Sequence, residues 1–254
     1  MLPFEAKPPI GQPFMELTEV TSTNLYAMQQ LQEKLAGHGA AFFAHHQTAG
    51  RGQRGRTWSD EPGQGIALSV ILDASFLSPS QPFPLICMVA LGALDLLQTY
   101  VPDGLSLKWP NDLYWRDRKA GGILIENQIR GDRWTGAVAG IGININQPAF
   151  PGFLQQAVSL KQITGREYDP VSLARDLCHF LEIRYRELLD GRFAEQLARY
   201  NDCLYKRGEI VHFKKDMIRF TGLVQHVSEL GRLRLSDAPI TELQFGEAEW
   251  LIGN

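Results

Sequence analysis

The 254-residue sequence has few cysteines and no C-x-x-C pair; Cys87, Cys178 and Cys203 lie far apart along the chain. An odd number of widely spaced cysteines argues against a disulfide framework and offers no ligand set for structural zinc. This cysteine usage is typical of a reducing compartment, so we expect a cytoplasmic protein.

Long apolar runs are also missing. The most apolar segment, residues 84–94, ends at Asp95, and it is much shorter than the ~20 residues that a membrane-spanning helix needs. The first ten residues, MLPFEAKPPI, lack a basic stretch followed by an apolar one and do not resemble a signal peptide. We therefore expect no membrane association.

The sequence has no excess of basic charge, because 25 Lys and Arg face 28 Asp and Glu and the net charge is -3. Such a chain has no global attraction to nucleic acid, so any basic patch must be local. Hydrophobic residues make up 44% of the chain and charged residues 21%, which is ordinary for a globular protein. The length suits one large domain and one small one.

The order of apolar runs and turn residues predicts an α+β fold with a mainly antiparallel sheet. Ser22, Thr23 and Asn24 provide capping side chains for a helix that runs to about Leu35. Asp169-Pro170 starts another helix, whose apolar face packs against the sheet. The other expected elements are strands at 15–20, 40–45, 66–72, 105–108, 122–126 and 134–143, and helices at 82–97 and 193–200.

The chain becomes rich in short β-type runs after a boundary near 203–208. We expect an N-terminal tail over 1–14, a large domain over 15–204 and a small β domain over 205–254. About fifty residues are marginal for a free-standing fold.

The most unusual segment, Gly50 to Trp58, sets three arginines among three glycines and ends in tryptophan. Glycines let backbone N–H groups approach an anion closely, and guanidinium groups match phosphate and carboxylate oxygens. Trp58 could then cover a base. In isolation, such a loop is also compatible with a solvated basic turn or an RNA-facing loop.

The same segment matches G-x-G-x-x-G, with Asp73 near the distance expected of a dinucleotide site. That fingerprint needs a helix directly after the glycines. Here residues 59–63 break the chain and the expected strand at 66–72 follows at once, which argues against dinucleotide binding.

Two further segments carry polar groups among apolar residues: Lys108-Trp-Pro-Asn-Asp112 and Arg118-Lys-Ala-Gly-Gly-Ile-Leu-Ile-Glu126. Burying the ammonium groups of Lys108 and Lys119 is costly unless they meet an anion, although each alone could be a half-exposed strand lysine. Asn111 and Asp112 could hold Mg²⁺ through oxygen atoms. Alone, Asp112 would be expected in a turn.

Residues 139–146 alternate small or polar residues with isoleucine along an expected strand. Gly140, Gly142, Asn144 and Asn146 then share one face. Glycines on this face leave room for a flat ligand, and the asparagines add polar groups. Alone, such glycines usually mark a bulge or close packing.

Together these motifs resemble the biotin protein ligase family. The resemblance rests on S-T-N before the first helix, G-R-G-x-R-G-R-x-W, K-W-P-N-D, R-K-x-x-G-I-L-I-E and G-x-G-I-N, in that order. It implies the mixed sheet with flanking helices that this family shares with class II aminoacyl-tRNA synthetases and lipoyl ligases. It also implies a small C-terminal SH3-like β-barrel.

The resemblance implies a role for each motif. Biotin would contact Ser22, Thr23, Gln47, Gly50, Arg51, Lys119, Gly122, Gly140 and Gly142. ATP would contact Arg51, Arg54, Arg56, Trp58, Asn111 and Asn144. Arg51, Lys119, Asp112 and Lys108 would be catalytic, with Asp112 serving Mg²⁺ or deprotonating the acceptor lysine. Many members have a basic residue where this chain has Gln53, which implies weaker retention of the intermediate.

The implied activity is ATP-dependent biotin protein ligation. Biotin would be activated as biotinyl-5'-AMP with release of pyrophosphate and then passed to a lysine of a biotin carboxyl carrier domain of a biotin-dependent carboxylase. About twenty residues precede Ser22, too few for the helix-turn-helix domain of members that repress transcription, so we expect no DNA binding. Homodimers occur in the family. The alternatives are a lipoate or octanoate ligase or transferase on the same fold, and a non-catalytic carrier- or RNA-binding module.

Overall fold

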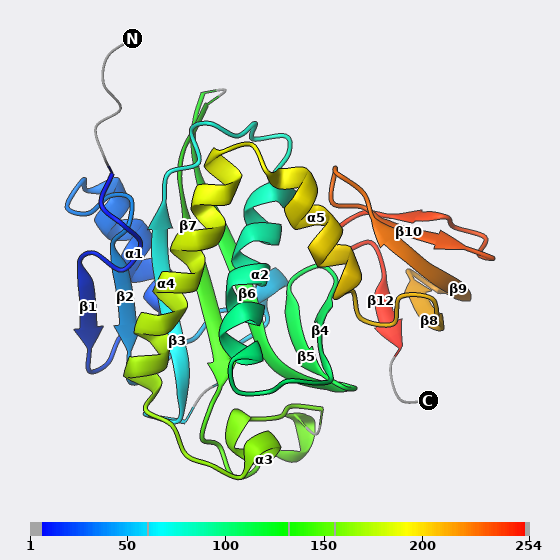
Figure 1. Cartoon of the computed structure of the whole chain (residues 1–254), viewed down its shortest axis with the longest axis horizontal. Helices are drawn as coiled ribbons and strands as arrows, with labels where there is room; N and C mark the ends of the chain where they lie inside the picture. Colours follow the sequence, from blue (N-terminus) through cyan, green and yellow to red (C-terminus); the bar gives the residue numbers. More distant parts are fainter. Residues whose placement is uncertain (1–6, 60, 132, 155, 252–254) are drawn as a thin grey trace.

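The computed structural model describes residues 7–59, 61–131, 133–154 and 156–251. Its larger sheet has the strand order β1-β2-β3-β7-β6-β5-β4 (Figure 1). The strands are β1 (Phe14–Leu17), β2 (Ala41–Ala44), β3 (Gly65–Leu72), β4 (Leu105–Lys108), β5 (Asp112–Trp115), β6 (Arg118–Arg130) and β7 (Arg133–Asn144). β1 and β2 run parallel, and the other pairs are antiparallel. The predicted α+β fold with a mainly antiparallel sheet is confirmed.

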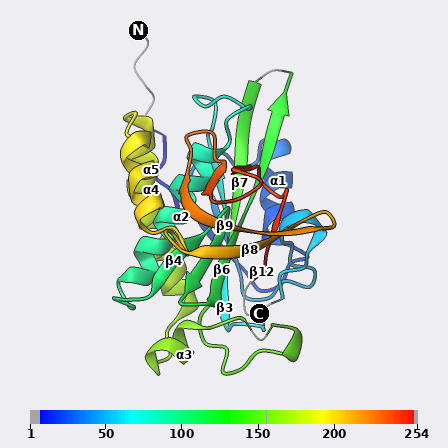
Figure 2. The ribbon, with the colours of Figure 1, turned by 90° about the vertical axis from the view of Figure 1, so that its right-hand side faces the viewer.

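Helices cover both faces of this sheet. α2 (Phe83–Gln98), α4 (Pro170–Leu189) and α5 (Phe193–Asp202) lie on one face, and α1 (Thr23–Gln32) lies on the other (Figure 2). The remaining helical segments are α3 (Leu160–Thr164) and the short turns η1 (Gln53–Gly55) and η2 (Gly152–Leu154). In the described part of the chain, we find no helix that is both long and apolar enough to span a membrane.

The predicted start of α4 is confirmed, since the Asp169 side chain accepts hydrogen bonds from the amides of Val171 and Ser172. α4 packs closely on α2 at Gly92, where a Cβ atom would lie 2.9 Å from Leu181 Cδ2. Leu181 and its apolar neighbours on α4 are buried. The main core therefore lies between these helices and the sheet.

The predicted capping role of Ser22, Thr23 and Asn24 is wrong. Ser22 stands at the N-cap position of α1 but makes no side-chain capping bond, and the helix ends at Gln32. The side chains of Thr23 and Asn24 are buried and bond to residues of other elements. Hydrogen bonds to other parts of the fold therefore occupy the side-chain groups that the local sequence pattern predicts as helix caps.

Strand β5 was not predicted. Asp112 begins this strand, where the sequence favoured a turn, and β6 begins at Arg118 rather than at Gly122. Arg116 has a φ of 52° in the tight connection between the two strands. β5 is short and begins with a carboxylate, so its sequence has little of the apolar alternation that predicts a strand.

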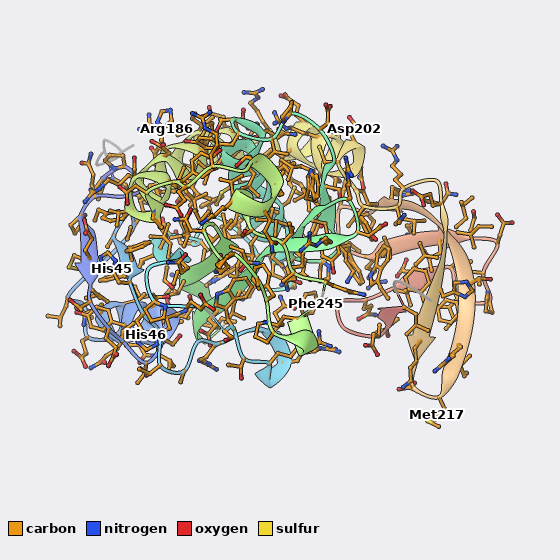
Figure 3. The ribbon with its side chains drawn as sticks, turned by 90° about the horizontal axis from the view of Figure 1, so that it is seen from below. His45, His46, Arg186, Asp202, Met217 and Phe245 are labelled. Atoms are coloured by element: carbon orange, nitrogen blue, oxygen red, sulfur yellow. The ribbon has the colours of Figure 1, made fainter. Side chains whose placement is uncertain are left out.

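The C-terminal sheet contains β8 (Ile210–Lys215), β9 (Ile218–Val227), β10 (Leu233–Ser236), β11 (Glu242–Leu243) and β12 (Glu249–Leu251). Its strand order is β11-β10-β9-β8-β12, and the two end strands do not pair with each other. The small β structure is thus present, but its barrel is not closed. Met217 marks the projecting β8–β9 turn (Figure 3) and is 92% exposed.

Trp109 connects the two sheets. Its side chain is buried, and its Nε1 donates a hydrogen bond to Gly231 O at 2.9 Å in the C-terminal sheet's β9–β10 turn. The Lys108–Asp112 motif therefore lies beside the C-terminal sheet as well as within the larger one.

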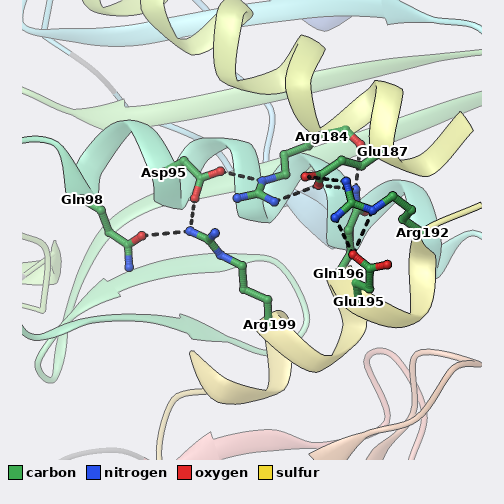
Figure 4. Close-up of polar contacts among 8 residues, drawn as sticks. All are labelled: Asp95, Gln98, Arg184, Glu187, Arg192, Glu195, Gln196 and Arg199. Atoms are coloured by element: carbon green, nitrogen blue, oxygen red, sulfur yellow. Dashed lines mark hydrogen bonds and ion pairs between the residues drawn. The ribbon is translucent and has the colours of Figure 1, made fainter. Parts of the chain in front are cut away.

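A buried ion-pair network joins α2, α4 and α5 (Figure 4). The Asp95 carboxylate accepts hydrogen bonds from Arg184 Nε at 2.6 Å and from Arg199 Nη2. The side chains of Arg184 and Asp95 are 12% and 8% exposed. Burial alone would lower the pKa of Arg184, but hydrogen bonds to Asp95 and Glu187 outweigh this effect and raise it.

Replacing Asp95 with alanine is expected to lower the free energy of unfolding by about 3 kcal/mol, because the buried guanidinium of Arg184 loses one of its two carboxylate partners. Urea denaturation measures the change. Asp176→Ala is the matched control, because Asp176 is an exposed residue of α4, where substitutions usually change stability by less than about 0.5 kcal/mol. Equal effects of the two substitutions would contradict a stabilising role for the network.

Candidate active site

A cavity of about 330 Å³ opens on the face of the large sheet that carries α1. Its walls come from the start of α1, the loop between β2 and β3, strands β3, β5, β6 and β7, and Phe150, Leu154 and Ala157. Thirteen predicted site residues line it: Ser22, Thr23, Gln47, Arg51, Arg56, Trp58, Asn111, Asp112, Lys119, Gly122, Gly140, Gly142 and Asn144. These thirteen residues, which lie up to 122 positions apart in the sequence, thus meet at one cavity.

The loop from Gly50 to Trp58 connects two strands, as predicted, and folds into a small hairpin. Gly52 N donates to Arg56 O at 2.7 Å and Trp58 N donates to Gly50 O at 2.9 Å. Gly50 is required by this approach, because a Cβ atom there would overlap the Trp58 carbonyl. Strand β3, and not a helix, follows the loop. The segment therefore lacks the helix that a dinucleotide-binding fingerprint requires.

Arg51 reaches from this loop to strand β6. Its Nη1 lies 2.9 Å from Glu126 Oε1, and Asn24 Nδ2 donates to Glu126 Oε2 at 3.0 Å. Arg51 also lines the cavity. A cation is therefore held at the cavity wall, where it can meet an anionic ligand.

A cluster of polar groups lies at the start of α1. The backbone N–H and the hydroxyl of Thr23 both donate to Gln47 Oε1, at 2.9 and 3.2 Å. Ser69, fully buried on β3, lies with its Oγ 2.8 Å from Thr23 Oγ1 and 2.6 Å from Asn24 Oδ1. Such a cluster can hydrogen-bond a small polar ring while apolar residues enclose the rest of a ligand.

Lys119, on β6, also lines the cavity and pairs with Asp112. Its Nζ is 2.7 Å from Asp112 Oδ1 and 5.8 Å from the centre of the Trp58 ring. Gly122 leaves space for this pair, because a Cβ atom there would lie 3.2 Å from Lys119 Nζ. The ammonium group is thus ordered at the cavity by one carboxylate and one aromatic face.

Gly140 and Gly142 follow one another on the cavity face of β7, as predicted. In the structure, however, their open faces are filled by protein side chains. A Cβ atom on Gly140 would overlap Asn24, and one on Gly142 would lie 2.5 Å from Trp58 Cε2. These glycines therefore admit Asn24 and Trp58 against the sheet, and these two side chains in turn form the cavity wall.

Lys108, Arg54 and Gly50 do not line the cavity in the described part of the chain. Lys108 Nζ lies 3.3 Å from Tyr114 Oη and 5.9 Å from the ring centre of Trp250 in β12. Burial lowers the pKa of Lys108 below its usual 10.5, and the Asp112 carboxylate only partly offsets this. Arg54 turns toward Gly246, where a Cβ atom would overlap its guanidinium group. Lys108 and Arg54 thus face the C-terminal sheet.

The asparagines divide between the cavity and the scaffold. Asn144 lines the cavity, but its Nδ2 donates to the carbonyls of Lys119 and Val158 at 3.4 and 3.3 Å. Asn146 lies beyond the end of β7 and exchanges hydrogen bonds with the backbone of Tyr168, so its predicted place on the strand face is wrong. Asn111 Nδ2 donates to Ile123 O at 2.6 Å, which leaves its Oδ1 for another partner.

The sequence did not single out several residues of this site. Asn24 and Glu126 belong to the motifs of the resemblance, but no ligand-binding or supporting role at the cavity was predicted for them. Ser69 stands in an otherwise apolar strand. That lone hydroxyl in a buried strand was the available signal, because a buried polar group needs a partner. Phe150, Leu154 and Ala157 also line the cavity, and no pattern in their segment predicted it.

The chain is also similar in sequence to known biotin ligases. The chain is 33% identical over 72% of its length to the bifunctional ligase/repressor BirA of Bacillus spizizenii. It is 30% identical over 61% of its length to the biotin--[acetyl-CoA-carboxylase] ligase of Paracoccus denitrificans, of which the match covers 65%. The chain spans about half the length of the BirA relatives that it matches.

Solved structures show the same architecture. Biotin protein ligase from Aquifex aeolicus in complex with biotin and ATP superposes with a TM-score of 0.78 at 28% identity, covering 93% of this chain and 97% of that one. Biotin protein ligase from Leishmania major in complex with biotinyl-5-AMP gives a TM-score of 0.58 at 25% identity, covering 94% and 100%. A model of the biotin/lipoate A/B protein ligase family matches residues 14–144. On this evidence, the chain belongs to the biotin/lipoate A/B protein ligase family.

Proposed function

We propose that this protein is an ATP-dependent biotin protein ligase. It activates biotin as biotinyl-5'-AMP with release of pyrophosphate, and then transfers biotin to a lysine of a biotin carboxyl carrier domain. The observation that carries the proposal is one cavity in which Arg51 and Lys119 lie together with the Thr23–Gln47 cluster. A relative that is a biotin--[acetyl-CoA-carboxylase] ligase, and a similar structure of a biotin protein ligase in complex with biotin and ATP, favour biotin over lipoate.

The first step joins two anions, a carboxylate and the α-phosphate of ATP. At 4 Å their repulsion is about 4 kcal/mol in a medium of effective dielectric near 20. Arg51 and Lys119 offset this repulsion and align the attacking oxygen, so the enzyme acts mainly through positioning and electrostatics. The carboxylate oxygen forms the bond to phosphorus while the bond to pyrophosphate breaks, and no enzyme nucleophile takes part.

The ureido ring of biotin fits the polar cluster at the start of α1. Ser22, Thr23 and Gln47 supply hydroxyl and amide groups at the cavity wall, and hydrogen bonds from Thr23 hold the Gln47 side chain in place. These donors and acceptors complement the N–H and C=O groups of a cyclic urea. The dithiolane ring of lipoate has no such groups, which gives a physical basis for choosing biotin.

The nucleotide lies against the Gly50–Trp58 loop in this proposal. Trp58 Nε1 is buried and has no hydrogen-bond partner among the described residues, which makes it available to the base or to a ligand oxygen. Arg56, Asn111 and Asn144 also line this part of the cavity. We assign no nucleotide contact to Arg54, whose side chain faces Gly246.

Mg²⁺ fits this site as a companion of ATP. The described residues contain no group of three or more His, Cys, Asp or Glu side chains that could hold a metal. Asp112 is one carboxylate beside the Asn111 amide oxygen, and Mg²⁺ is commonly held by one or two carboxylates plus substrate phosphates. Asp112 and Asn111 would hold the ion, which when bound neutralises charge on the leaving pyrophosphate.

In the second step the neutral amine of the acceptor lysine attacks the carbonyl carbon of the adenylate, an amide bond forms and AMP leaves. We assign the proton of that amine to Asp112, which lines the cavity. The acceptor domain would approach the outer edge of β6. β5 pairs with β6 as far as Gly122, whereas β7 pairs with it along to Arg130, so the β6–β7 hairpin projects beyond β5 (Figure 2). An edge of this kind can pair with a strand of a partner.

Biotin-dependent release of pyrophosphate tests the proposal. The purified protein is incubated with ATP and Mg²⁺ together with biotin, lipoate or neither acid. We expect release with biotin well above the other two reactions. Release that depends on lipoate alone would identify lipoate as the substrate. If neither acid increases the release, a non-catalytic binding module is favoured. We also propose that the protein is cytoplasmic, does not bind specific DNA and forms a homodimer.

Replacing Gly142 with alanine is expected to raise the KM for ATP about tenfold, because the new Cβ atom displaces the Trp58 ring. Steady-state pyrophosphate release measures KM, and tryptophan fluorescence reports the displacement. Gly37→Ala is the control, since a Cβ atom at Gly37 meets nothing within 4 Å. An unchanged KM despite altered fluorescence would argue that Trp58 does not contact the nucleotide.

Replacing Gln53 with arginine is expected to slow dissociation of the adenylate severalfold. Gln53 lines the cavity beside Arg51, so the substitution adds a cation near the phosphate of the intermediate. A chase of labelled biotinyl-adenylate with unlabelled ligand gives the dissociation rate. If that rate does not change, the weaker retention expected from Gln53 is wrong.

A further inference from the structure

Glu126 engages both of its carboxylate oxygens. Oε1 accepts a hydrogen bond from Arg51 Nη1 at 2.9 Å, and Oε2 accepts one from Asn24 Nδ2 at 3.0 Å. The Glu126 side chain is 26% exposed, and Asn24 as a whole is 3% exposed. Because one side of this carboxylate is tied to a buried amide, its position is fixed more firmly than that of a typical surface acid.

The amide of Asn24 is itself fixed by the sheet. Its Oδ1 accepts from Ser69 Oγ at 2.6 Å, and its Nδ2 also lies 3.3 Å from Leu124 O. Gly140 on the neighbouring strand has no side chain, and a Cβ atom there would overlap Asn24. A connected series of contacts therefore runs from β3 through α1 to β6 and ends on the guanidinium group of Arg51.

The same series touches the polar cluster proposed for the ureido ring. Ser69 Oγ lies 2.8 Å from Thr23 Oγ1, and Thr23 donates to Gln47. The two ends of biotin, its ring and its carboxylate, would thus meet groups that share one buried hydroxyl as support. Residues whose orientation is fixed by such secondary contacts lose little conformational freedom when a ligand binds.

Arg51 meets Glu126 through Nη1 alone. A guanidinium group carries five N–H donors, and among the described residues the Arg51 side chain has no other hydrogen-bond partner. Arg51 lines the cavity, whereas Glu126 does not. The arrangement leaves donors directed to a ligand while the carboxylate holds the group from behind.

We propose that Glu126 is a positioning residue that orients Arg51 for recognition of the substrate carboxylate. This inference rests on the proposed function, because it assigns the carboxylate of biotin to Arg51. Glu126 acts through Arg51 and touches neither substrate nor reacting atoms. Its effect is therefore specific for ligands that carry the carboxylate, and it differs from a general structural effect on the cavity.

The test compares binding of biotin and of biotinol, the alcohol analogue without the carboxylate, by isothermal titration calorimetry. In Glu126→Gln, a side-chain oxygen remains for Asn24 but the charge that holds Arg51 is lost. We expect the Kd for biotin to rise about tenfold and the Kd for biotinol to stay the same. Glu126→Asp, which keeps the charge, is expected to recover part of the biotin affinity. Glu229→Gln, at an exposed position in the β9–β10 turn, is the control.

Three results would overturn the proposal: equal weakening of both ligands, no change for either, or tighter binding of biotin. Equal weakening would assign Glu126 to the cavity structure through Asn24, and tighter binding would make it a competitor of the substrate. Absence of biotin binding and of biotin-dependent pyrophosphate release in the unaltered protein would instead overturn the proposed function. Measurements on the unaltered protein therefore distinguish a failure of this inference from a failure of the proposed function.

Discussion

Replacing Lys119 with alanine is expected to lower the rate of biotin-dependent pyrophosphate release by about 10²- to 10³-fold. Lys119 is a cation at the cavity wall that can bridge the carboxylate and the α-phosphate. Removing it leaves the repulsion between the two anions to Arg51 alone, and it also leaves Asp112 without the partner that lies 2.7 Å away. An unpaired carboxylate beside the reacting phosphate would add to the loss.

The substitution should not unfold the protein, since the Lys119 side chain is 35% exposed. Far-ultraviolet circular dichroism and urea denaturation check this point. Lys214→Ala, in the C-terminal sheet and outside the cavity, is the control for removal of one lysine charge. If the Lys119→Ala protein folds normally and releases pyrophosphate at a rate near that of the control, Lys119 has no role in the reaction.

Replacing Arg51 with alanine is expected to lower kcat/KM for biotin in the first step by about 10²-fold. The loss combines weaker recognition of the carboxylate with weaker stabilisation of charge in the transition state. Glu126 would also lose its cation. Because Arg51 is exposed on a loop, this ion pair contributes little to the stability of the fold.

Arg54 provides a matched control for Arg51. It belongs to the same loop and carries the same charge, but its side chain faces Gly246 rather than the cavity. We expect Arg54→Ala to change kcat/KM for biotin less than about threefold, since only a distant, solvent-screened charge is removed. Equal losses for the two substitutions would mean that the loop contributes its overall charge, and that the position of Arg51 has no special role.

The local patterns in the sequence predicted much of the scaffold. The periodicity of residues 171–188 and the Asp169-Pro170 start identify α4, and the break after Trp58 identifies a strand connection in place of a dinucleotide fold. These features depend on neighbours within a few residues of each other. The alternation of glycine along β7 likewise predicted which face of the strand the cavity occupies.

The directions of individual side chains could not be predicted in this way. Arg51 and Arg54 are three residues apart in one loop, yet one faces the cavity and the other faces the C-terminal sheet. The difference follows from a left-handed turn at Arg54, with φ of 56°, and from the position of Gly246. Gly246 lies almost 200 residues away in the sequence, so local patterns around Arg54 could not predict this contact.

The glycines of β7 show a similar limit. The sequence indicated that Gly140 and Gly142 leave space, but it did not identify what fills that space. Asn24 and Trp58 do so in the structure, because the strand brings α1 and the loop against the same face. The support of Arg51 by Glu126 was missed for the same reason, since 75 residues separate the two side chains.

Mass spectrometry of the purified protein incubated with ATP, Mg²⁺ and either biotin or lipoate tests the central claim most directly. The account predicts a protein-bound biotinyl-adenylate in the first reaction and no corresponding lipoyl-adenylate in the second. A lipoyl-adenylate without a biotinyl-adenylate would contradict the assigned substrate. The absence of any acyl-adenylate with either acid would contradict the proposed chemistry itself.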